Sequence, residues 1–106
     1  MKKEIGGFKF QWDDKKASIN LQKHGISFTD AALVFQDKFR MDFVDEKHSD
    51  EEERFITIGK AIDVVFVVYV ERDEKYNIRL ISARPAKEDE RREYDEYCAL
   101  LSGRQL

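Results

Sequence analysis

The residues best suited to chemistry are three arginines that lie within or beside apolar runs. Arg79 lies within the run 78–83, Arg84 follows that run, and Arg54 precedes Phe55. Arginine stays protonated and offers paired N–H donors that match a phosphate group. It can therefore stabilise charge on a phosphoryl oxygen but cannot act as a base. This pattern favours a phosphate-handling surface where the run through Arg84 meets a charged, helix-favouring segment.

Each arginine also has a purely structural interpretation. Arg79 can form a cross-strand pair on a solvated sheet face. Arg84 can form an ion pair with Glu88 or Glu90, and Arg54 one with the acidic residues just before it. The sequence leaves both interpretations open.

Other kinds of catalytic site lack their motifs. The sequence contains no Gly-rich phosphate loop and no His-Glu-x-x-His zinc motif. His24 and His48 are too far apart in sequence to indicate a metal pair. The single cysteine, Cys98, excludes an internal disulfide framework and a multi-cysteine metal site. We therefore expect no metal and no cofactor.

Length and composition indicate one domain, residues 1–106. The chain is 42% hydrophobic and 39% charged, and its net charge is −3. Acidic residues are concentrated in residues 45–53, which hold six of them and one lysine, so basic patches remain possible elsewhere. No apolar run approaches the ~20 residues that span a bilayer, and the N-terminus does not resemble a signal peptide. We expect a cytoplasmic protein with no membrane contact.

The hydrophobic pattern predicts an α+β fold in the order strand, two helices, four strands, helix. Asp13 and Ser27 are suited to cap the first two helices, and Gly25 to end the first. Pro85 suits the first turn of the last helix. The predicted strands are 8–12, 39–44, 55–58, 64–70 and 76–83, and residues 73–75 form a tight turn. The last four strands are expected to form an antiparallel meander, with the helices mainly on one sheet face.

Strict alternation in the last strand sets an expected orientation. Ile78, Leu80 and Ser82 should face one way, and Arg79 the other. The first strand, 8–12, should join the same sheet, because its aromatic face needs apolar partners.

Two long stretches carry a family resemblance. The first stretch reads Phe10-x-Trp12-Asp13-x-x-Lys16-Ala17-x-x-Asn20-x-x-Lys23-His24-Gly25-Ile26-Ser27-Phe28, then Ala31 and Val34-Phe35. The second stretch contains Glu53-Arg54-Phe55, Ile58-Gly59, Ile78-Arg79-Leu80-Ile81-Ser82-Ala83-Arg84-x-Ala86, Glu90-Arg91 and Tyr94. Together they span roughly residues 8–97 and resemble the signature of BrnT toxins from bacterial toxin–antitoxin pairs. Pro85 departs from the pattern, because the family commonly has a basic residue there.

The resemblance implies a fold and a function. The fold would be that of RelE-like ribonucleases, and the activity would be metal-independent mRNA cleavage that arrests growth. The partner would be a BrnA-like antitoxin with a ribbon-helix-helix DNA-binding domain. The pair would repress its own operon, so that operator DNA is contacted only through the antitoxin.

The resemblance also implies roles for particular residues. The arginines Arg54, Arg79 and Arg84 would hold and stabilise the phosphate while the RNA 2′-hydroxyl attacks it. Proton transfer would fall to some of four residues: Lys23, His24, Glu53 and Tyr94. Histidine is the residue type whose ordinary pKa best suits this task.

The proton-transfer candidates have structural alternatives as well. Lys23 can be a cation facing the end of the helix dipole, His24 a packed histidine and Tyr94 a core tyrosine. Two rival functions also remain: a non-catalytic toxin-like subunit that acts as co-repressor with its antitoxin, and a generic RNA-binding domain.

Overall fold

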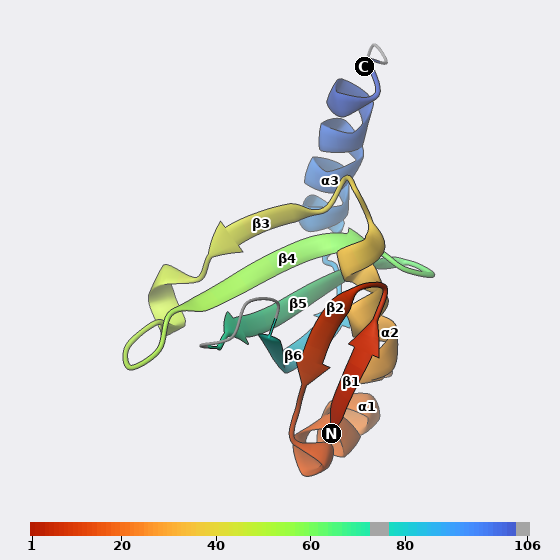
Figure 1. Cartoon of the computed structure of the whole chain (residues 1–106). Coiled ribbons are helices and arrows are strands. Elements are labelled where there is room, and N and C mark those ends of the chain that lie inside the picture. Colours follow the sequence, from red (N-terminus) through yellow and green to blue (C-terminus); the bar gives the residue numbers. More distant parts are fainter. Residues whose placement is uncertain (73–76, 104–106) are drawn as a thin grey trace.

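A computed structural model describes residues 1–72 and 77–103. It confirms an α+β fold built on one six-stranded sheet, with strand order β1-β2-β6-β5-β4-β3 (Figure 1). The strands are β1 (Lys2–Ile5), β2 (Phe8–Gln11), β3 (Met41–Val44), β4 (Arg54–Lys60), β5 (Val64–Glu71) and β6 (Asn77–Pro85). The helices are α1 (Asp14–His24), α2 (Phe28–Leu33) and α3 (Glu88–Leu101), with short 3₁₀ helices η1 (Val34–Gln36) and η2 (Glu46–His48). Within the described residues, no helix is both long and apolar enough to cross a membrane.

Strands β3 to β6 pair antiparallel in chain order, as the meander prediction requires. Strand β2 joins the same sheet by pairing parallel to β6, with Phe10 opposite Ile78. Its aromatic side chains thereby reach the core, where Phe10 is 1% exposed. The predicted turn at residues 73–75, and Tyr76 at the predicted start of the last strand, lie outside the described residues.

The N-terminal strand β1 is absent from the sequence-based prediction. Its residues are mostly charged and do not alternate with apolar ones, and it is held by antiparallel pairing with β2. Gly6 and Gly7 connect the two strands with φ values of 58° and 86°. Two successive positive φ angles suit the type I′ turns of tight hairpins. The Gly-Gly pair was therefore the available signal for this hairpin.

The first two helices begin where their capping residues predict, and α1 also ends at the predicted residue, Gly25. Asp13 Oδ1 accepts hydrogen bonds from the backbone N–H groups of Lys15 and Lys16, at 2.8 and 3.3 Å. The Ser27 hydroxyl accepts one from the N–H of Asp30 at 3.1 Å. Such caps satisfy N–H groups that have no partner inside the helix. These ends are thus determined by local sequence.

Different helices pack on the two faces of the sheet. On the first face, α2 and η1 pack against Val65, Val67 and Tyr69 of β5. On the second face, Tyr94 of α3 packs with Ile58 and other residues of β4 and β5. Helix α3 then extends beyond the sheet (Figure 1). The prediction of helices mainly on one face therefore describes α2 and η1, whereas α3 covers one end of the second face.

The junction between β6 and α3 differs from the prediction. Pro85 is the last residue of β6, opposite Val65, and α3 begins only at Glu88. The backbone N–H of Ala86 donates to Val64 O at 3.0 Å, which keeps the chain against the sheet past the proline. Placing Pro85 in the first turn of the helix was wrong because a proline is equally compatible with a strand end.

Candidate nucleic-acid interface

The strand register places all three predicted arginines on the second face. Arg54 of β4 and Arg79 of β6 both lie opposite Val70 of β5, and Arg84 lies opposite Phe66. Residues directly opposite in an antiparallel pair share a face. Two strand spacings separate Arg54 from Arg79, which places their Cα atoms about 10 Å apart.

A β-bulge in β6 brings Arg84 to this face. Val68 pairs with Ser82 and Tyr69 with Leu80, so Ile81 is the extra residue. A bulge of this kind shifts the alternation by one residue. The expected orientation of Ser82 was therefore wrong: it shares the second face with Arg84, and Ala83 enters the core at 0% exposure. Without the bulge, Arg84 would point to the opposite face from Arg79.

Arg79 is half-buried and held by neutral partners. Its Nη1 donates to Gln11 Oε1 at 3.0 Å. Gln11 Nε2 in turn donates to Asn77 Oδ1 at 3.0 Å, so both ends of the amide are engaged. An amide orients the guanidinium without cancelling its charge. The cross-strand pair that the sequence allowed thus exists, but with a glutamine rather than a carboxylate.

Arg84 has the ion pair that its structural interpretation predicted. Its Nη1 and Nη2 donate to the two carboxylate oxygens of Glu90 at 2.8 and 3.0 Å. The guanidinium carbon also lies 3.8 Å from the centre of the Phe66 ring. Hydrogen bonding from Arg84 holds the pKa of the Glu90 carboxyl below its ordinary value. Arg84 therefore faces any ligand with part of its charge already offset.

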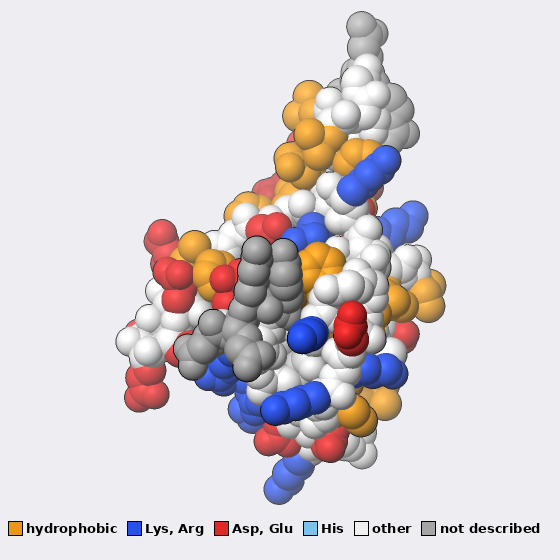
Figure 2. All heavy atoms as spheres, in the orientation of Figure 1, with side chains coloured by type: hydrophobic (Ala, Val, Ile, Leu, Met, Phe, Trp, Pro, Cys, Tyr) orange, Lys and Arg blue, Asp and Glu red, His pale blue; other side chains and the backbone are white. Residues whose placement is uncertain are grey.

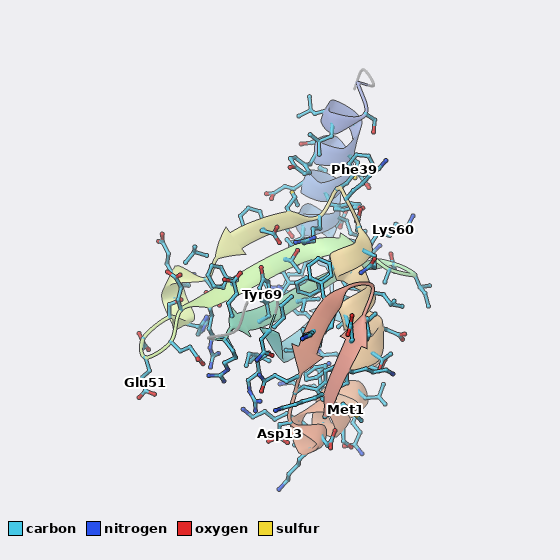
Figure 3. All side chains as sticks on the ribbon, viewed as in Figure 1. Met1, Asp13, Phe39, Glu51, Lys60 and Tyr69 are labelled. Atoms are coloured by element: carbon cyan, nitrogen blue, oxygen red, sulfur yellow. The ribbon has the colours of Figure 1, made fainter. Side chains whose placement is uncertain are left out.

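Arg54 is half-buried at the start of β4, beside the acidic connection. None of the six ion pairs found among the described residues includes it. Its backbone N–H donates to the Ser49 hydroxyl at 2.9 Å, which fixes where the strand begins. Glu53 is exposed at the end of the connection. Figure 3 shows Glu51 at the projecting tip, far from Asp13 at the start of α1.

Lys23 and His24 reach the neighbourhood of β6 because α1 lies along the free edge of that strand. The side chain of Asn20 accepts from the N–H of Ala83 at 3.1 Å and donates to its carbonyl at 2.8 Å. These two hydrogen bonds replace the ones that a neighbouring strand would make with Ala83. Lys23 and His24 line a hollow of about 210 Å³ together with Ser82. No motif around Asn20 in the sequence indicates this pairing.

Tyr94 of α3 lies away from Arg54 and Arg79. The residue is 5% exposed in the apolar cluster beneath α3, and its hydroxyl donates to the Asp37 carboxylate. Burial, together with this hydrogen bond, raises the pKa of Tyr94 well above its ordinary value. Asp37 also accepts from the N–H groups of Phe39 and Lys60. The tyrosine thus ties α3 to the loop after η1 and is not gathered with Arg54 and Arg79.

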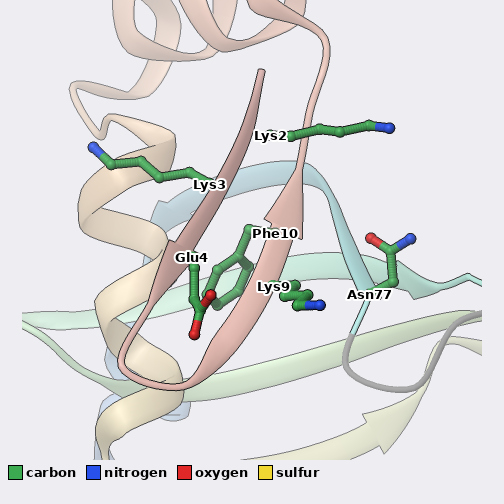
Figure 4. Close-up of a pocket in the computed structure, with 6 residues that line it drawn as sticks. All are labelled: Lys2, Lys3, Glu4, Lys9, Phe10 and Asn77. Atoms are coloured by element: carbon green, nitrogen blue, oxygen red, sulfur yellow. The ribbon is translucent and has the colours of Figure 1, made fainter.

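The β1–β2 hairpin adds lysines that the sequence analysis did not select. Lys2 lies opposite Gln11, so it extends the row that contains Arg79. Figure 4 shows Lys2 and Lys9 on one side of the hairpin and Lys3 on the other. In Figure 2 basic side chains gather beside this hairpin, and acidic ones mark the β3–β4 connection. Recognising the Gly-Gly hairpin would have revealed this extension.

Metal-ligating residues do not cluster in the described ranges 1–72 and 77–103. No three His, Cys, Asp or Glu side chains there lie close enough together to hold an ion.

Comparison with known proteins shows the family of the chain. The fold defines a small α+β domain, and a solved structure shares it: the crystal structure of the Brucella abortus ribonuclease toxin BrnT. The two superpose with a TM-score of 0.57 at 22% identity, over 74% of this chain and 96% of that one. Residues 12–90 match the family described as "Ribonuclease toxin, BrnT, of type II toxin-antitoxin system". The chain therefore belongs to the BrnT family. A search of curated proteins finds no match.

Proposed function

We propose that this BrnT-family protein is a metal-independent endoribonuclease of the RelE-like kind that cleaves messenger RNA in the cytoplasm. The observation that carries the proposal is the shared sheet face of Arg54, Arg79 and Arg84. Guanidinium groups held in fixed positions can stabilise the extra negative charge that develops on a phosphate under attack. The family's description as ribonuclease toxins supports RNA as the substrate.

The proposed reaction needs only the RNA itself and two proton transfers. The ribose 2′-hydroxyl attacks the adjacent phosphorus, and the bond from phosphorus to the 5′-oxygen of the next nucleotide breaks. A base takes the 2′-proton, and an acid gives a proton to the departing 5′-oxygen. The products are a 2′,3′-cyclic phosphate and a 5′-hydroxyl end.

The side chains divide between these tasks. Arg79, oriented by Gln11, and Arg54 would bind the phosphate oxygens, and Arg84 would assist once Glu90 releases it. His24 is the preferred proton carrier, because it lines the hollow beside Ser82 on the edge of the same face, with Lys23 next to it. Tyr94 we assign to structure, since its hydroxyl is engaged by Asp37.

The proposed partner is a BrnA-like ribbon-helix-helix antitoxin that carries the complex to operator DNA. It would cover the sheet face of Arg54, Arg79 and Arg84, which we call the arginine face. Membership of a type II toxin–antitoxin family supports an antitoxin partner. A segment with acidic or aromatic side chains would suit this face, because it would shield the like charges of Arg54 and Arg79 from each other.

One observation favours the second candidate, a non-catalytic co-repressor. The Arg84 guanidinium is already paired with the Glu90 carboxylate, so part of its charge is offset before any ligand binds. A subunit of this kind would bind antitoxin and repress the operon without cleaving RNA.

Digestion of an RNA oligonucleotide by the purified protein tests the proposal. We expect products with 2′,3′-cyclic phosphate ends, at a rate that chelator does not change. Arg79→Ala should lose on the order of 10²-fold in rate, the typical effect of removing one oxyanion donor. Arg92→Ala, an exposed arginine on α3, is the matched control and should cleave normally. Loss of cleavage in chelator, restored by a divalent ion, would overturn the mechanism. Operator repression without cleavage would establish the co-repressor.

His24→Gln separates catalysis from packing. If His24 carries a proton, the rate falls and its pH dependence near neutrality flattens. An unchanged pH–rate profile with a lowered melting temperature would instead show that His24 is a packing residue.

A further inference from the structure

The geometry points to a second RNA contact: the hollow between α1 and β6 binds a nucleotide that adjoins the scissile phosphate. This inference rests on the proposed ribonuclease function and names where the substrate continues beyond the arginines. The hollow has a volume of about 210 Å³, and its walls include Lys16, Ile19, Lys23, Ile81 and Ser82. Pockets for drug-sized ligands usually measure ~300–1,000 Å³, so this one suits a single base or sugar rather than a longer segment.

The hollow is continuous with the arginine face. Ser82 lies on that face, two residues before Arg84 and on the far side of the bulge from Arg79. It is also part of the hollow's wall. A strand of RNA whose phosphate lies at the arginines therefore reaches α1 by crossing the edge of β6.

Two lysines flank the hollow in a fixed frame. Lys16 and Lys23 are seven residues apart, which places them on one side of α1 about 10 Å from each other along its axis. Asn20 lies between them and is 6% exposed, and its bonds to Ala83 fix the helix against the strand. Neither lysine belongs to the six ion pairs of the described residues. Two cations on a rigid support, neither within ion-pair distance of a described carboxylate, suit the phosphates on either side of one nucleotide.

The apolar walls suit the base. Ile19 is 51% exposed although it belongs to a helix that packs on the protein, and Ile81 is half-buried at the bulge. The Ser82 hydroxyl can donate and accept, as a ribose or a base edge requires. Unstacked bases of single-stranded RNA are commonly bound in this way, with apolar contact to the ring and polar contact to its edge.

Salt-dependent binding tests the inference without any cleavage. The probe is a fluorescent 2′-O-methyl RNA decamer, which lacks the attacking hydroxyl and stays intact. Each phosphate contact that is lost should reduce the slope of log K against log salt by about 0.7 for a single strand. We expect this loss for Lys16→Ala. Lys15→Ala is the matched control, because Lys15 is exposed on the same helix but does not line the hollow.

A second variant, Ile19→Ser, tests the apolar wall of the hollow. Ile19→Ser should weaken binding of the decamer several-fold and leave the salt slope unchanged, because it removes contact with a base and no charge. An effect of Lys16→Ala no larger than that of Lys15→Ala would overturn the proposal. So would a Lys16→Ala variant that binds RNA normally but loses affinity for the antitoxin, since the hollow would then belong to the protein partner.

The experiments distinguish a failure of this inference from a failure of the proposed ribonuclease function. If wild-type protein binds the decamer through Lys16 but cleaves no RNA, the proposed ribonuclease function is refuted, whereas RNA binding in the hollow is supported. If wild-type protein cleaves RNA and Lys16→Ala keeps the full salt slope, RNA binding in the hollow is refuted, whereas the ribonuclease function is supported.

Discussion

Replacing Asn20 should separate α1 from β6 and thereby show how the hollow and His24 are held in place. In Asn20→Ala the N–H and the C=O of Ala83 both lose their partner, and a buried group without one costs about 1–3 kcal/mol. The higher helix propensity of alanine offsets about 0.6 kcal/mol of this cost. The two groups together cost about 2–6 kcal/mol, so the expected net loss in the free energy of unfolding is about 1.5–5.5 kcal/mol. A loss of about 2 kcal/mol, within this range, would lower Tm by about 10 °C in a domain of this size.

Urea unfolding followed by circular dichroism measures this loss. Gln22→Ala is the control, because Gln22 is exposed on the same helix, and it should change stability by no more than about 0.5 kcal/mol. Asn20→Asp keeps an acceptor for the N–H of Ala83 but cannot donate to its carbonyl, so it should also be destabilised. The urea midpoint should fall with an unchanged m value. Equal midpoints for Asn20→Ala and Gln22→Ala would refute the claim that this amide pairs α1 with β6.

Three further predictions concern other parts of the fold. Tyr94→Phe removes the hydrogen bond to Asp37 and should cost about 1–3 kcal/mol. Because the pKa of Tyr94 is raised in the folded protein, its contribution is present below pH ~10 and is lost above it, so the variant should show a shallower alkaline loss of stability. Gly59→Ala would place a Cβ 2.7 Å from a methyl carbon of η1, and thermal melting should show a loss of about 1–3 kcal/mol. Glu90→Gln should reduce the loss of stability in acid, because the lowered pKa of Glu90 means that its pairing with Arg84 contributes above pH ~4.5 and fades below it. An acid unfolding titration that matches wild type would contradict the last of these.

Several features could be read from the sequence because they depend on neighbouring residues alone. A cap forms between a side chain and backbone groups two or three residues away, so Asp13 and Ser27 located two helix starts correctly. The strands of the meander follow from alternation and apolar content. The family was also identifiable, since its signature is a pattern of residue types along the chain. The selection of Arg54, Arg79 and Arg84 rests on the same signature and on the chemistry of arginine.

The spatial relations of the site were decided by tertiary structure. The bulge at Ile81 arises from how β6 pairs with β5, and no residue type nearby marks it. It alone places Arg84 on the same face as Arg79, because one extra residue reverses every later side chain in a strand. Strand β1 exists through pairing with β2, although its own charged sequence favours no strand. Asn20 pairs with Ala83, which lies 63 residues further along the chain, so only the folded structure brings the two residues together. Local sequence thus determined which elements form, and the pairing of distant segments decided which of their side chains meet.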